Sequence, residues 1–192
     1  MKKIVFALIT VLAVSFCMEW GESQKRSDVV VEGEVARRVQ EIYNTVIPWY
    51  NSPNSYHSEN DFDKRFLSRE MQVMRRMADA VLRKLRERGE DDIPPCYDYD
   101  HWVMGQDWEN LSIKTDSIHV LSPDTAEAYM CITNCGHPQN FMLVMTRDDK
   151  GWFIDDFRQY DEQAKAFAIS DKRNLEDYIK EKFPAPSEVE KN

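Results

Sequence analysis

The chain has 192 residues, 42% of them apolar and 31% charged, a balance typical of one globular domain and unlike a disordered or fibrous protein. It carries 25 Lys and Arg against 34 Asp and Glu, which gives a net charge of −9. Since so acidic a chain repels phosphate backbones and anionic lipid surfaces, we expect no nucleic-acid partner.

The first 23 residues have the pattern of a signal peptide. Two lysines at positions 2 and 3 precede an almost continuous apolar run over residues 4–16, which is too short to span a bilayer. Gly21-Glu22-Ser23 offers a cleavage site, and the alternatives are a cut just after Cys17 or a lipid attached to Cys17. We expect an exported protein of the periplasm or cell envelope. It is either released or, as the alternative, anchored to the membrane only through that lipid.

The helical half is expected within a single domain over residues 34–183, after a loose polar leader over residues 24–33. Apolar residues at three- and four-residue steps from Val35 to Tyr50 predict a first helix. A short helical segment over residues 61–67 leads to a second long helix, which Ser68 caps and Gly89 ends. Its buried stripe is expected to comprise Met71, Met74, Ala78, Val81, Leu82 and Leu85, and Arg75 and Arg76 are expected on its solvated face.

The rest of the domain is expected to be mainly strands. Clean alternation over residues 125–133 predicts a strand with one buried face, and Asp148 to Gly151 has the composition of a hairpin turn. Further strands are predicted over residues 111–121 (one strand or two), 140–146 and 152–156. A short C-terminal helix over residues 175–183 follows a cap at Ser170 or Asp171, and residues 184–192 form a polar tail.

Helices followed by an antiparallel meander predict an α+β fold, with N-terminal helices packed on a curved sheet and a pocket between the two layers. The segments Tyr97-Asp98-Tyr99-Asp100, Gly105-Gln106-Asp107-Trp108 and Asp149 to Asp155 carry a resemblance to a known family. Over residues 35–157 the chain resembles small exported bacterial domains of unknown function with a cystatin-like, nuclear-transport-factor-like fold. The resemblance implies the fold and export, and it implies no activity.

The densest candidate site runs from Tyr97 to Trp108. Acidic groups beside aromatic rings can acquire raised pKa values, so the catalytic candidates are Asp98, Asp100 and His101, acting beside a Tyr hydroxyl. The binding candidates are Tyr97, Tyr99, Trp102, Gln106, Asp107 and Trp108. The structural alternative, which the sequence favours, is that Asp107 caps backbone amides while Trp102 and Trp108 close the core.

Three cysteines follow the signal segment: Cys96, Cys131 and Cys135. In an oxidising compartment we expect a disulfide from Cys96 to Cys131 or Cys135, with free thiols as the alternative. The spacing Cys131-x-x-x-Cys135-x-His137 is also that of zinc ligands, but its residues divide between a strand and a turn, so we expect no metal.

The sequence supports two functions. The first is a non-catalytic envelope protein that binds a small ligand or a protein partner in the cleft between helices and sheet, without a cofactor. The second is a lyase or isomerase that uses Asp98, Asp100 or His101 in the same cleft. The two differ in whether these side chains face a pocket together with a hydrogen-bond donor.

Overall fold

The computed structural model describes residues 27–53, 60–90, 92–94 and 96–183, so the predicted signal segment, Cys17 and the tail lie outside the described residues. The N-terminal helix, helical over residues 27–50, comes first. The remaining elements, in chain order, are α2 (Phe62–Phe66), α3 (Arg69–Glu87), β1 (Ser112–Ser122), β2 (Thr125–Asn134), β3 (His137–Asp148), β4 (Gly151–Asp161), β5 (Ala166–Ser170) and α4 (Asp171–Lys182). This set of helices and strands confirms the predicted α+β fold class.

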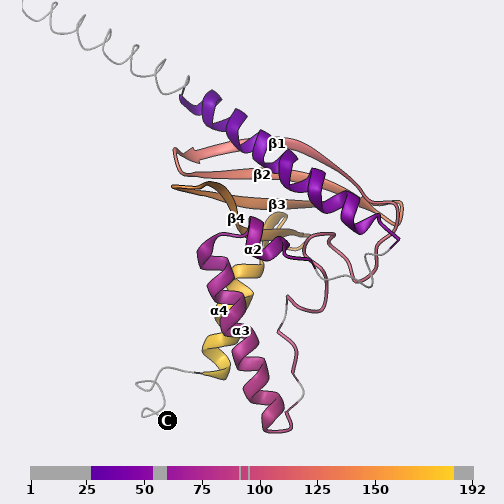
Figure 1. The fold of residues 1–192 in the computed structure, drawn as a ribbon, viewed down its shortest axis with the longest axis vertical. Helices are drawn as coiled ribbons and strands as arrows, with labels where there is room; N and C mark the ends of the chain where they lie inside the picture. The colour runs from indigo at the N-terminus through magenta and orange to yellow at the C-terminus, as the bar shows by residue number, and fades with distance from the viewer. Residues whose placement is uncertain (1–26, 54–59, 91, 95, 184–192) are drawn as a thin grey trace, which may run out of the picture.

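The five strands form one curved antiparallel sheet in the order β1-β2-β3-β4-β5, so each strand pairs with its neighbour in sequence (Figure 1). β2 alternates in burial along its whole length, as its sequence predicts. Its buried residues Ala126 and Ala128 pair with Met145 and Leu143 of β3, which places the core on one face of the sheet. β5 was not predicted, because five residues at the exposed edge of a sheet carry little periodic signal.

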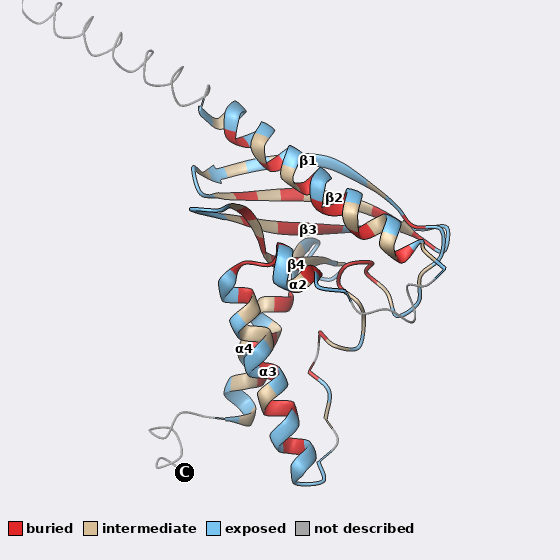
Figure 2. Cartoon of the chain, viewed as in Figure 1, coloured by how far each residue is buried: buried red, intermediate tan, exposed pale blue. Residues whose placement is uncertain are grey.

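The N-terminal helix lies across the sheet and turns its buried side toward it (Figure 2). The leader prediction is wrong for residues 27–33, which are helical. The apolar stripe begins earlier than expected, because Val31 lies one turn before Val35 and is also buried. Arg38 fixes the helix to the sheet by donating from Nε to the carbonyl of Trp152, at 2.9 Å.

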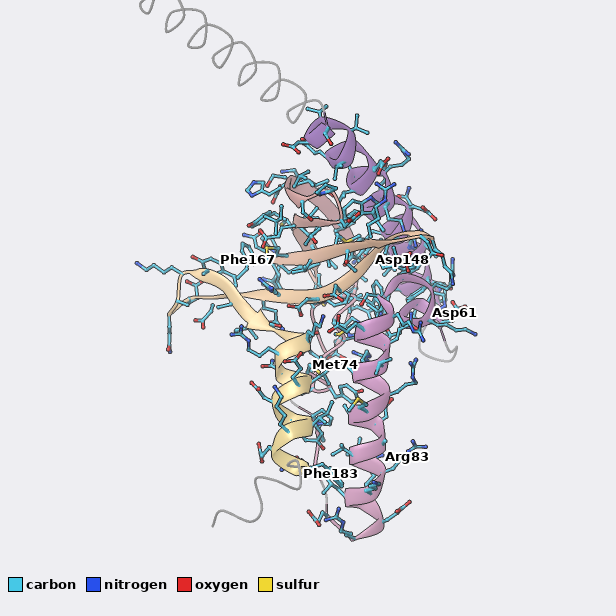
Figure 3. The ribbon with its side chains drawn as sticks, turned by 90° about the vertical axis from the view of Figure 1, so that its left-hand side faces the viewer. Asp61, Met74, Arg83, Asp148, Phe167 and Phe183 are labelled. Carbon is cyan, nitrogen blue, oxygen red and sulfur yellow. The ribbon has the colours of Figure 1, made fainter. Side chains whose placement is uncertain are left out.

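The N-terminal helix lies across the sheet, whereas α3 pairs with α4, and these two helices extend together away from β4 (Figures 1 and 3). Both helices have the predicted serine caps, Ser68 accepting from Met71 N and Ser170 from Arg173 N, each at 3.0 Å. None of the described helices combines the length and apolar character needed to cross a membrane.

Candidate functional site

A pocket of about 550 Å³ opens where the end of the N-terminal helix, α2, α3 and the loop of residues 96–106 meet. This volume lies within the range of small-molecule sites. Its lining comprises Tyr50, Asn60, Asp63, Arg75, Cys96, Tyr97, Asp98, Tyr99, Asp100, His101, Trp102 and Gln106. The pocket therefore gathers all the predicted catalytic and binding residues except Asp107 and Trp108.

The expected position of the site needs correction. No residue of the five strands lines this pocket, so it does not lie between helices and sheet. A smaller cavity of about 350 Å³ does lie there, between the N-terminal helix and β1–β2, and its lining includes Val39, Tyr43 and Met130. That cavity contains none of the predicted site residues, because the loop of residues 96–106 leaves the layer interface and faces α2 and α3.

The loop folds back on itself at Asp100. The backbone N–H of Asp100 donates to the carbonyl of Gly105 at 2.9 Å, and Val103 N donates to the carbonyl of Asp100 at 3.2 Å. Met104 adopts a positive φ of 53° inside this turn. The turn presents Asp100, His101 and Trp102 to the pocket in succession.

Asn134, at the end of β2, holds the loop against the sheet. Its Nδ2 donates to the carbonyl of Asp107 at 2.8 Å, and its Oδ1 accepts from Glu109 N at 3.1 Å. Gly105 must lack a side chain here, because a Cβ would lie 2.8 Å from Asn134 Nδ2 and 3.0 Å from the carbonyl of Asp107. Asn134 thus caps the Glu109 amide at the entrance to the sheet, while the side chain of Asp107, predicted to cap amides there, is exposed.

Asp100 is a half-buried carboxylate that accepts from two neutral donors. The hydroxyl of Tyr50 donates to its Oδ2 at 2.5 Å, and Trp102 N donates to its Oδ1 at 2.9 Å. Burial, then the nearby charge and hydrogen bond of Asp100, raises the pKa of Tyr50 well above its ordinary value, so this hydroxyl keeps its proton. Each oxygen of the carboxylate thus accepts one hydrogen bond, and neither donor carries a charge.

Asp63, on α2, is the hub of a polar network. Its Oδ2 lies 2.7 Å from Arg75 Nε, and its Oδ1 accepts from Trp102 Nε1 at 2.9 Å. Burial alone would raise the pKa of Asp63, but contact with His101, the charge of Arg75 and the Trp102 N–H outweigh it and hold the pKa below its ordinary range. Asp63 is therefore a fixed anion that neutralises Arg75.

His101 is buried, with 4% of its surface exposed, between this network and the ring of Phe157. Its Nδ1 lies 3.2 Å from Arg75 Nη1. Because a guanidinium can only donate, Nδ1 accepts and the neutral ring carries its proton on Nε2. Nε2 lies 3.4 Å from Asp63 Oδ1, within ion-pair distance, but it is not aligned for a hydrogen bond and has no such partner in the described part of the chain.

The two tyrosines of the loop connect the pocket to α3 and α4. The Tyr97 hydroxyl donates to Asp79 Oδ1 at 2.9 Å, and the Tyr99 hydroxyl donates to Asp171 Oδ1 at the start of α4. Asp171 is fully buried. Burial raises its pKa from 3.8 to about 6, although the Tyr99 hydroxyl and the charge of Arg75 act against this rise.

The three cysteines are free thiols in the structure, so the expected disulfide is absent. Cys96 is buried in the pocket wall, where burial raises its pKa to about 12. Cys131 is half-buried on β2, on the strand face opposite the core, and Cys135 is exposed in the turn after that strand, with a φ of 52°. Within the described ranges, no group of three or more His, Cys, Asp or Glu side chains is arranged to hold a metal ion.

Sequence reasoning missed the residues that hold the loop from other elements: Tyr50, Asp63, Arg75 and Asp171. Arg75 was expected on a solvated helix face, but only 20% of its side chain is exposed and it pairs with Asp63. α2 has five residues, too few to display a polar pattern of its own. The remaining signal in the sequence was slight: Asp63 is an acid that directly follows the apolar Phe62 and precedes Phe66 by three residues.

Trp102 and Trp108 have structural roles as well. Trp102 is buried, its indole N–H donates to Asp63, and its ring lies edge-on to those of Tyr43 and Phe157. Trp108 is half-buried and packs edge-on to Tyr50, with ring centroids 5.1 Å apart. Both rings close the core around the loop, as the structural alternative predicted, and Trp102 also lines the pocket.

Comparison with known proteins adds little to this site. No family model and no curated protein matches the chain. Among solved structures, it is similar to a phospholipid-binding protein from Ralstonia solanacearum in complex with a phospholipid. The two share 10% identity over 80% of this chain and 90% of that chain, with a TM-score of 0.28. A likeness this low carries no argument, so membership of the exported cystatin-like family stays a prediction.

Proposed function

We propose that this is an exported envelope protein that binds a small ligand, without catalysis, in the pocket at the loop of residues 96–106. One observation carries the proposal: a cavity of about 550 Å³ stays open although most polar groups of its wall are already bonded to one another. Pre-formed pockets with a few fixed polar groups are typical binding sites. The export part of the proposal rests on the signal-like residues 1–23.

The arrangement of the acids favours binding over proton transfer. A general base needs a pKa near the working pH and access to the proton that it removes. Asp63 is held as an anion between Arg75 and Trp102, with its pKa below the ordinary range. Both oxygens of Asp100 already accept hydrogen bonds. Neither carboxylate is prepared as a base.

A lyase or isomerase is the second candidate, favoured by the Tyr50 hydroxyl on Asp100 beside His101 in one pocket. A carboxylate with a neighbouring phenol is the pairing that abstraction of a proton beside a carbonyl requires. This candidate predicts turnover of a carbonyl substrate that is lost in both Asp100→Ala and His101→Ala. Turnover that both variants retain would eliminate it.

The test of the binding function is native mass spectrometry of the protein exported by its own signal, with and without reductant. We expect an added mass that Asp98→Trp removes, because Asp98 is an exposed residue on the pocket wall and an indole there fills the opening. Asp149→Trp, in the exposed β3–β4 turn, is the matched control and should keep the mass. Small-ligand binding would be contradicted if the wild type had the mass of the polypeptide alone. It would also be contradicted if the added mass were that of another protein.

A further inference from the structure

The charged side chains of the pocket do not balance. Three carboxylates (Asp63, Asp98 and Asp100) line it with one guanidinium, that of Arg75. Asp63 and Arg75 neutralise each other at 2.7 Å. Among the residues that the structure describes, neither Asp98 nor Asp100 has a cationic side chain within 4.0 Å. The pocket thus retains two negative charges after its internal ion pair is formed.

Among the pocket's carboxylates, Asp100 would stabilise the positive charge of a ligand most. It is half-buried, its two donors are neutral, and three aromatic side chains, those of Tyr50, Tyr99 and Trp102, line the same pocket. A carboxylate withdrawn from water is stabilised when an opposite charge comes close, and aromatic rings favour cations. An anionic ligand would instead meet uncompensated negative charge.

His101 provides a second, independent feature. It lines the pocket and is almost completely buried, and its Nε2–H has no hydrogen-bond partner in the described residues. Buried donors in folded proteins are nearly always satisfied, so an unmatched one beside a cavity indicates a missing acceptor. A ligand oxygen would supply that acceptor after a small rotation of the ring.

We infer that the ligand presents a cationic amine or quaternary ammonium group to Asp100 and a neighbouring oxygen to His101, as an amino alcohol does. This inference rests on the proposed function and names the ligand class for the same pocket. Asp98, exposed at the pocket opening, adds a longer-range attraction for the same charge. The ion pair between Asp63 and Arg75 stays intact when the ligand binds.

Choline and 3,3-dimethylbutan-1-ol test the charge preference, because they share shape and hydroxyl and differ in one positive charge. Isothermal titration of the exported protein at low salt should give choline a Kd at least about tenfold lower than that of the neutral alcohol. Asp100→Asn keeps the shape and an acceptor for Trp102 N, so it should remove most of this difference in affinity between the two probes. Added NaCl should weaken the binding of choline and leave the binding of the neutral alcohol unchanged.

Two further variants keep the test decisive. Asp98→Asn changes an exposed residue and should weaken choline by about two- to threefold even if Asp100→Asn fails to fold. Asp149→Asn, in the exposed β3–β4 turn, is the matched control and should change neither Kd. Equal affinity for the two probes would overturn the cation preference and leave the binding function standing. Binding of neither probe would also overturn it, and the native mass would then decide the binding function separately.

The amine could reach the pocket as a free molecule or as a lipid headgroup. Co-sedimentation with phosphatidylcholine vesicles that saturating choline abolishes would support the inference with a headgroup as source. Choline binding without co-sedimentation would support it with a soluble amine. Co-sedimentation that choline and Asp100→Asn both leave unchanged would contradict the placement of the amine at Asp100.

Discussion

Replacing Asp171 by Asn tests how the start of α4 is held beneath the site. Asp171 is fully buried; its Oδ1 accepts from Tyr99, and its Oδ2 has no hydrogen-bond partner in the described residues. Burial raises its pKa from 3.8 to about 6, and the charge of Asp156 adds to the rise against the effects of the Tyr99 hydroxyl and the charge of Arg75. This difference in pKa corresponds to about 3 kcal/mol of unfolding free energy.

The sign follows from the direction of the shift. Because the folded-state pKa lies above the unfolded value, ionised Asp171 opposes folding. The cost is fully present above about pH 6 and is lost as the pH falls toward about pH 4. As the pH falls from about 7.5 to about 5, the unfolding free energy of the wild type should therefore gain about 1 kcal/mol from this group, and that of Asp171→Asn should not.

Urea denaturation of both proteins at both pH values measures this difference. Each protein is compared with itself at the two pH values. The free-energy cost of burying an Asn amide at position 171 is the same at both pH values and therefore cancels. Asp149→Asn, an exposed change in the β3–β4 turn, should keep the wild-type pH dependence. If Asp171→Asn also kept it, the ionisation of Asp171 would not oppose folding and the reasoning would be refuted.

The remaining predictions concern α3, the loop and the thiols. Ser68→Ala removes the cap of α3 and the 2.6 Å hydrogen bond to Asp155, so urea denaturation should show a loss of about 1–3 kcal/mol; no loss would contradict the cap. Gly105→Ala should destabilise the chain and weaken ligand binding, whereas Gly33→Ala, with open space around it in a helix, should stabilise it by up to about 1 kcal/mol; equal effects would contradict the crowding at Gly105. Cys135 should react with a maleimide in the folded state and Cys96 only after unfolding, as peptide mass mapping would show; a Cys96–Cys135 crosslink would contradict this.

Local patterns allowed much of the fold to be predicted. The alternation of β2 and the Ser68 cap of α3 are written in consecutive residues, and both are confirmed. The site was predicted in part, because residues 97–102 are dense in acids and rings. What escaped is the set of partners from distant elements, since the contacts of Asp63 with Arg75 and Trp102 arise only when α2, α3 and the loop come together.

The most direct test of the central claim is a crystal structure of the protein purified after export by its own signal. Our account predicts electron density for a small molecule within hydrogen-bond distance of Asp100, in the pocket also lined by Tyr50 and Trp102. Density in the smaller cavity between the N-terminal helix and the sheet, with this pocket holding only water, would contradict it.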